Sequence, residues 1–317
     1  MPYSIRIKAI LATLVRLLAM CAGLLTNVLT ADEGVADAFA KLREQYQSLD
    51  TFYLKSTINI AVHVGKAMIP PTKDVRKTRI EYESWGTRNG SYKVVVRYYD
   101  ANGVFQQGLS YAYDGKLFQT FDHVTKVFAF GREDPDQLPM APENPLFAPV
   151  RFLSRDTDNC RACTLKLGHI LSVKAWQDKQ ASAKVLAGSG LNQNRMIIEL
   201  PYGVLEGKSV SSRVYFGETP AYLPTRIDLV DQKGTIVSST GIVYKAMSMN
   251  GKATYWPDSV RVSTFSDKGE VEIELTAQLE DLRINGTFPE DTFAVDHSSA
   301  RAFWDRDAKT FVDTRPN

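Results

Sequence analysis

The sequence has few of the residues on which most active sites and metal centres depend. Its 317 residues include only four histidines, scattered at positions 63, 123, 169 and 297. No two of them have the spacing of a zinc site, and neither an HExxH segment nor a GxSxG nucleophile elbow occurs. The Gly-Ser-Gly segment at 188–190 is not followed by the helical pattern of a phosphate-binding loop. These absences predict a protein without enzymatic activity, cofactor or metal.

Cysteine is also scarce, with three in the chain. Cys160 and Cys163 share one NCRAC segment, in which acidic and amide residues before the pair predict a turn. A zinc site would need two more ligands, haem attachment would need a histidine after the second cysteine, and a thioredoxin-like pair would begin a helix. We therefore expect Cys160 and Cys163 to form a short structural disulfide in an oxidising compartment.

A run of apolar residues near the N-terminus is too short for a membrane span. Residues 1–16 carry three basic side chains and no acid, residues 17–29 are largely apolar, and small residues and the first acids follow. This layout predicts a secretory signal peptide over residues 1–31 and a periplasmic protein. A membrane helix needs about 20 apolar residues, and this run is shorter. Retention of the segment as an N-terminal membrane anchor is therefore the less favoured alternative. Lipidation of Cys21 is a second alternative, although Met20 departs from the small residue of a bacterial lipobox.

Neither sign of charge predominates. The chain has 38 basic and 36 acidic residues, and loss of residues 1–31 would remove three bases and no acid, leaving a net charge of −1. No basic run interleaved with aromatic residues occurs. A nearly neutral chain of this kind does not attract nucleic acid, so no nucleic-acid partner is expected.

Alternation of apolar and polar residues is the dominant pattern. The segment from Phe52 to Val64, FYLKSTINIAVHV, alternates strictly and predicts a half-buried strand about 43 Å long. Just before it, residues 32–50 place apolar side chains on one stripe of an amphipathic helix. The stripe consists of Val35, Ala38, Phe39, Leu42, Tyr46 and Leu49.

Many further strands follow in quick succession, joined by short turns. Asn89-Gly90, Asn102-Gly103 and Asp114-Gly115 are typical hairpin turns, because both residues of each pair tolerate a positive φ. The result is an antiparallel meander over a domain at 32–297, with a polar tail at 298–317.

Residues 131–159 interrupt the strands with five prolines and an apolar cluster. This composition predicts a long loop with short helices that could serve as a lid.

Four segments together resemble the LolA-like family of periplasmic lipoprotein carriers, the outer-membrane lipoprotein-sorting proteins. They are FAKLREQYQSLDTFYLKSTINI, SYAYDGKLFQTFDHVTKVFAF, LPTRIDLVDQKGTIVSS and LEDLRINGTFPEDTFAVD. The resemblance implies a mainly β fold, in which a large curved antiparallel sheet forms an unclosed β-barrel, or half-pipe, with an N-terminal helix and a helical lid segment. It also implies an apolar cavity for a lipid or an acylated lipoprotein, with envelope membrane proteins as further partners.

The apolar alternation and the lid segment indicate which residues would bind lipid in a monomeric carrier. The cavity would be lined by Leu54, Ile58, Ile60, Val94, Val96, Phe128 and Phe130, or by the opposite faces of their strands. The lid would consist of Leu146, Phe147, Val150 and Phe152. A tightly packed core gives the same pattern, and so does a non-enzymatic envelope sensor or scaffold that binds a protein partner through an edge strand.

Overall fold

The computed structural model describes residues 36–46, 48–63, 76–132, 144–149, 181–186, 196–205, 208–217, 222–249 and 252–312. The signal peptide expected at 1–31 lies outside these ranges, as do Cys21, Val150, Phe152, Cys160 and Cys163. The cleavage, the disulfide and that part of the lid therefore stay predictions.

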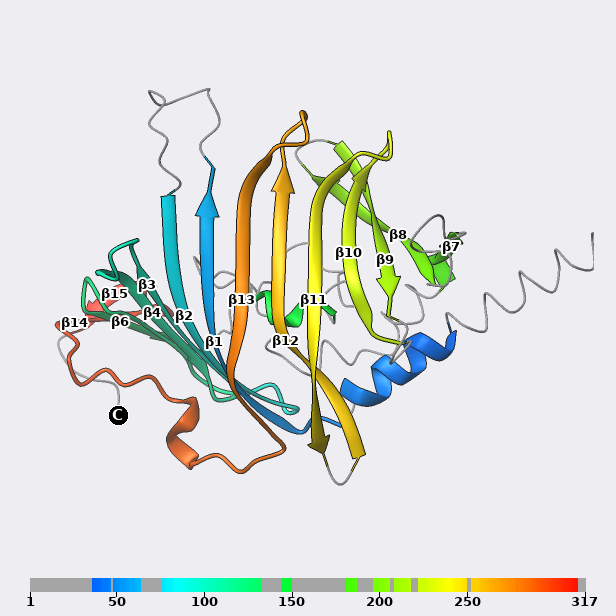
Figure 1. The fold of residues 1–317 in the computed structure, drawn as a ribbon. Helices are drawn as coiled ribbons and strands as arrows, with labels where there is room; N and C mark the ends of the chain where they lie inside the picture. Colours follow the sequence, from blue (N-terminus) through cyan, green and yellow to red (C-terminus); the bar gives the residue numbers. More distant parts are fainter. Residues whose placement is uncertain are drawn as a thin grey trace, which may run out of the picture.

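The described strands form one large open sheet (Figure 1). Its first six strands are β1 (Thr51–Val62), β2 (Arg76–Thr87), β3 (Tyr92–Tyr99), β4 (Phe105–Tyr113), β5 (Phe118–Asp122) and β6 (Val127–Gly131). The next seven are β7 (Lys184–Leu186), β8 (Ile197–Leu205), β9 (Lys208–Phe216), β10 (Pro224–Asp231), β11 (Ile236–Met249), β12 (Lys252–Phe265) and β13 (Val271–Ile284). The last two are β14 (Ala302–Asp305) and β15 (Thr310–Val312).

Two antiparallel meanders make up this sheet. The strand order is β15-β14-β6-β5-β4-β3-β2-β1-β13-β12-β11-β10-β9-β8-β7, so β1 and β13 join the meanders at the middle. All neighbours are antiparallel except β14 and β6, which run parallel. Since β15 and β7 end the sheet without pairing to each other, the predicted mainly β, unclosed architecture is confirmed.

Helix 36–46 and the 3-10 helix η1 (Pro145–Phe147) pack on the same face of the sheet, which we call the inner face (Figure 1). The expected apolar stripe of the helix is buried there, with Ala38, Phe39, Leu42 and Tyr46 all at most 3% exposed. Helix formation thus follows the 3.6-residue spacing, and burial of the stripe fixes the helix against the sheet.

The alternation predicted for β1 is present in the structure. Phe52, Leu54, Ser56 and Ile58 are buried on the inner face, and the residues between them are not. A register shift in the pairing of β1 with β13 falls between Lys55 and Ser56. The described strand ends at Val62, and Val64 lies outside the described residues.

The C-terminal segment extends the sheet and covers part of its other face, which we call the outer face. β14 pairs with β6, and a backbone N–H of Val295 donates a buried hydrogen bond of 2.9 Å to the side chain of Gln119. Val295 completes a small second core with Ala112, Phe121 and Phe128. The segment expected as a tail at 298–317 therefore contributes two strands, at residues 302–305 and 310–312.

Candidate functional site

The inner face holds one continuous apolar cluster that spans both meanders. It brings together side chains from helix 36–46, from η1 and from every strand that lies between β5 and β8 in the order of the sheet, these two included. Six of the side chains expected to bind lipid lie in it, and Ile60 packs against it while partly exposed. The six are Leu54, Ile58, Val94, Val96, Leu146 and Phe147.

Two of the expected lining residues lie elsewhere. Phe128 and Phe130 belong to the small core on the outer face, because they pair across β5 and β6 with Phe121 and Gln119. Paired residues of neighbouring strands share a face, and the outer face of β6 is covered here by the C-terminal segment. These two phenylalanines therefore lie on the face of the sheet opposite to the one that carries Leu54 and Val94. Val150 and Phe152 are not among the described residues.

A chain of aromatic rings joins the covering segments to the sheet. The ring of Tyr46 on the helix lies 5.6 Å from Trp256 of β12, which lies 6.1 Å from Phe147 of η1. Phe147 in turn lies 5.6 Å from Phe52 of β1, and all three contacts are edge-to-face. Such pairs are each worth about 0.5–1.5 kcal/mol beyond their buried area, so the rings fix helix and η1 to both meanders.

One buried polar contact supports this apolar attachment. The side-chain amide of Asn144 donates to the hydroxyl oxygen of Ser56 at 2.8 Å and accepts from the backbone N–H of Leu146 at 3.1 Å. Asn144 thereby caps η1 and fixes it to the centre of β1. Sequence reasoning missed this pair, although a lone serine on the apolar side of the predicted strand was a usable signal.

The apolar surface of the inner face continues beyond its buried part toward one end of the strands. Here lie five side chains that we call the inner rim: Ile60 and Val62 of β1, Val262 of β12, and Ile273 and Leu275 of β13. All five are partly or largely exposed, with Ile273 at 39%. The next inward pair, Ile58 and Ala277, is fully buried. An apolar strip thus leads from the surface to the buried cluster.

Among the described residues of the inner face, several buried polar atoms have no hydrogen-bond partner. They include the hydroxyl of Tyr46 and the indole nitrogen of Trp256, whose rings are in contact. Burial raises the pKa of Tyr46 well above its usual value, and the nearby hydroxyl of Tyr222 acts in the same direction. Tyr46 therefore stays protonated and neutral, as suits an apolar site.

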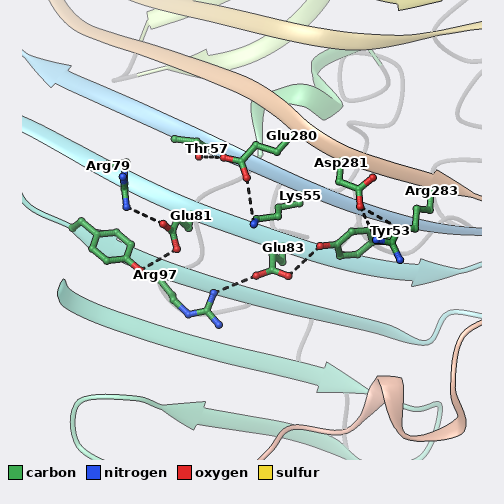
Figure 2. Close-up of polar contacts among 11 residues, drawn as sticks. Tyr53, Lys55, Thr57, Arg79, Glu81, Glu83, Arg97, Glu280, Asp281 and Arg283 are labelled. Carbon is green, nitrogen blue, oxygen red and sulfur yellow. Dashed lines mark hydrogen bonds and ion pairs between the residues drawn. The ribbon is translucent and has the colours of Figure 1, made fainter. Parts of the chain in front are cut away.

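The outer face of the central strands is polar, as Figure 2 shows for β1, β2, β3 and β13. Glu83 accepts from Arg97 and from the hydroxyl of Tyr53, both at 3.2 Å. Glu280 accepts from Thr57 and lies 3.4 Å from the ammonium group of Lys55. These opposite charges pair across neighbouring strands and are partly exposed, so they give the outer face solubility and little stabilisation.

Surface clefts lined by described residues lie on the outer face. One, of about 420 Å³, is bordered by residues of β1, β2 and β13, among them Lys77, Arg79 and Glu274. Two others, of about 270 and 290 Å³, are lined by residues of β8 and β9 and by the C-terminal segment around Asp296. A lysine borders each of these clefts (Lys77, Lys184 and Lys93), so an acyl chain would meet charges there that the inner rim lacks.

A serine–histidine contact that sequence reasoning missed also lies on the outer face. The hydroxyl of Ser110 and Nε2 of His123 are 2.8 Å apart. Burial, and then the charges of Arg97 and Lys126, lower the pKa of His123, so the ring is neutral near pH 7. The Ser110 residue is 5% exposed, which leaves its hydroxyl little access to a substrate. The contact therefore links β4 to the end of β5.

The described residues contain no group of three or more potential metal ligands. None of the helices within the described ranges has the length and apolarity needed to cross a membrane.

The chain is similar to several solved structures at low sequence identity. No family model and no curated protein matches it. A DUF1329 family protein from Desulfovibrio piger is similar over 85% of this chain and 98% of its own, with 11% identity and a TM-score of 0.47. A putative outer membrane lipoprotein-sorting protein domain from Vibrio parahaemolyticus is similar over 83% and 97%, with 12% identity and a TM-score of 0.43.

A third similar structure is the MucA/MucB complex of Pseudomonas aeruginosa, with 8% identity and a TM-score of 0.24 over 80% of this chain and 99% of that chain. Because these identities and scores are low, the function is argued from the residues of this chain alone.

Proposed function

We propose that this protein is a non-enzymatic carrier that holds the acyl chains of a lipid or an acylated lipoprotein against the inner face of its sheet. The observation that supports this most is the inner rim, where the apolar surface continues past the segments that cover the rest. Side chains such as Ile60 and Ile273 remain partly exposed on a face that elsewhere is buried. A single curved sheet with one polar face gains stability by covering the other, and an acyl chain would complete that cover.

The energetics favour an apolar ligand at this position. Burial of one CH₂ group contributes about 0.8 kcal/mol, so a few methylenes against the inner rim would give measurable affinity. The polar outer face offers no comparable gain, because its charged side chains already pair with one another.

Segment 144–149 would act as the movable cover. Its attachment is made by side chains, through the ring of Phe147 and the amide of Asn144, to β1 and β12. In the proposed cycle this cover separates from the sheet and the acyl chain takes over its apolar contacts. Export through the signal peptide would place the carrier in the periplasm, where it would act as a monomer between envelope membranes.

Transfer of lipid from vesicles tests the proposal. The mature protein is incubated with vesicles of dioleoyl phosphatidylcholine and separated from them by flotation, and the lipid retained per protein is measured. Ile273→Asp places a charge on the inner rim and should lower the retained lipid roughly tenfold, since a buried isoleucine contributes about 1.5–3 kcal/mol. Val243→Asp is the matched control, because Val243 is 60% exposed and pairs with Ser259 on the outer face.

Equal retention by both variants and the unaltered protein would contradict the proposal, and so would the absence of any retained lipid. In the second case the alternative is a sensor or scaffold. Its partner would pair with an edge of the sheet such as β7, where Val185 is 41% exposed.

A further inference from the structure

One arginine reaches the inner face from the C-terminal segment. The backbone N–H of Arg306 donates to the carbonyl of Phe130 at 2.8 Å, which continues the pairing of β14 with β6. Phe303 of β14 packs into the small core on the outer face, and alternation directs Arg306 to the opposite side. Its guanidinium carbon lies 5.0 Å from the centre of the Phe118 ring, which is buried in the inner cluster.

A glycine in β6 makes this path possible. Gly131 pairs with Phe118, so a side chain at this position would lie on the inner face. A Cβ atom built on Gly131 would lie 3.0 Å from Cβ of Arg306, closer than such atoms ordinarily approach. The missing side chain of Gly131 thus leaves the space through which the side chain of Arg306 passes over β6.

Within the described part of the chain, no carboxylate forms an ion pair with the guanidinium of Arg306. By contrast, Arg97, Arg213 and Arg226 of the same sheet each pair with a carboxylate. Its polar contact is a long one, from Nη2 to the hydroxyl of Thr120 at 3.4 Å, and its Nε is buried without an acceptor.

Its electrostatic surroundings consist of aromatic hydroxyls. Burial lowers the pKa of Arg306, and the hydroxyls of Tyr111 and Tyr92 on the inner face oppose that effect. Arginine nevertheless remains charged at all ordinary pH values. A partly buried cation without a carboxylate is unfavourable by itself, and an anion beside it would remove that cost.

We propose that Arg306 receives the anionic headgroup of the ligand, so that the carrier prefers acidic amphiphiles to zwitterionic ones. This inference rests on the proposed function, because it assigns the head of the ligand whose acyl chain would take over the contacts of segment 144–149. Those contacts include Phe52, which lies in the same cross-strand row as Phe118. A guanidinium suits phosphate and carboxylate oxygens, which it can bind through two parallel hydrogen bonds. The 3.4 Å contact of Nη2 with Thr120 is long, so Nη2 can exchange it for such an oxygen, whereas the buried Nε would become accessible only if the side chain moved.

Competition between two lipids with the same chains tests the inference. The mature protein is incubated with mixed vesicles of dioleoyl phosphatidylglycerol and dioleoyl phosphatidylcholine, and the retained lipids are quantified. The lipid retained by the unaltered protein should be enriched roughly tenfold in phosphatidylglycerol, because one hydrogen bond to a charged group changes an affinity by about that factor. Arg306→Gln should abolish the enrichment while total retained lipid changes little, and Arg306→Lys should restore part of it.

Two further variants make the test specific. Arg301→Gln removes the same charge from an exposed position on the same segment and should keep the enrichment. Gly131→Ala should reduce the enrichment with Arg306 intact, because the added methyl group displaces its side chain. Inorganic phosphate at the same molar concentration should leave the enrichment unchanged if the anion must be part of an amphiphile.

The outcomes separate this inference from the proposed function. Retained lipid without enrichment, or enrichment that survives Arg306→Gln, would overturn the headgroup site and leave the carrier proposal intact. Loss of enrichment in Arg301→Gln to the same degree would also overturn it, because general surface charge would then be the cause. Displacement of phosphatidylglycerol by inorganic phosphate would indicate a simple anion site. No retained lipid of either kind would overturn the carrier proposal itself.

Discussion

Asn144 and Ser56 are hydrogen-bonded at 2.8 Å in the interior, although 88 residues separate them in the sequence. Ser56 is the buried polar residue in the middle of β1, and Asn144 is the cap of η1. The covering segment therefore has a specific position on the sheet as well as apolar contacts. This contact leads to the first prediction.

Replacement of Asn144 by alanine should lower the free energy of unfolding by about 1–3 kcal/mol, because it leaves the buried hydroxyl of Ser56 without its donor. Ser56→Ala combined with Asn144→Ala should cost less than the sum of the two single changes. Urea unfolding of the four proteins measures this coupling in a double-mutant cycle. Strictly additive effects would show that the contact does not position η1.

Phe147→Ala should destabilise the protein by about 3–5 kcal/mol and speed the exchange of bound lipid, because the ring connects Phe52 and Trp256. The emission of Trp256 reports the loss directly, since the two rings are 6.1 Å apart. Phe311→Ala is the control, because Phe311 is 63% exposed and should change stability little. If lipid exchange is unchanged in a folded Phe147→Ala protein, segment 144–149 is not the cover.

The charged outer face should contribute little to stability. Glu83→Gln removes the charged acceptor of Arg97 and Tyr53, and we expect it to cost at most about 1 kcal/mol because the pair is partly exposed to solvent. Leu54→Ala, a change on the inner face of the neighbouring strand, should cost about 2–5 kcal/mol. Thermal unfolding compares the two. A larger loss for Glu83→Gln would mean that the polar network, rather than the apolar cluster, stabilises the centre of the sheet.

Stability should fall in alkaline solution through buried tyrosines. Burial raises the pKa of Tyr98 on the inner face from the usual 10.0 of a tyrosine to about 12. Between these two values the folded state holds the proton that the unfolded state has lost, so the free energy of unfolding decreases as the pH rises from about 10 to about 12. Urea midpoints at about pH 9 and about pH 11 should differ more for the unaltered protein than for Tyr98→Phe. The same difference in both proteins would rule out Tyr98 as a contributor.

The fold was largely predictable from local signals, and the site was predictable only in part. The alternation of β1 and the Asn-Gly and Asp-Gly turns placed Leu54, Val94 and their neighbours on one face correctly. Phe128 and Phe130 alternate just as clearly, but alternation does not tell which face of a strand another segment will cover. In this case Val295, far along the chain, covers the outer face of β6.

Contacts between distant segments were beyond the reach of pattern analysis. Arg306 lies in a segment without strong periodicity, and its position depends on the parallel pairing of β14 with β6 and on the missing side chain of Gly131. The partnership of Asn144 and Ser56 likewise depends on tertiary structure. Each residue alone offered a weak signal, a turn-forming asparagine before proline and a hydroxyl on an apolar strand face.

The most direct test of the carrier proposal is native mass spectrometry, with extraction and identification of bound lipid, on the mature protein purified from its native cells. The proposal predicts a mass above that of the polypeptide, and an extract that contains an acidic phospholipid or an acylated peptide. A protein of polypeptide mass that also takes up no lipid from vesicles would contradict the proposal and favour a sensor or scaffold.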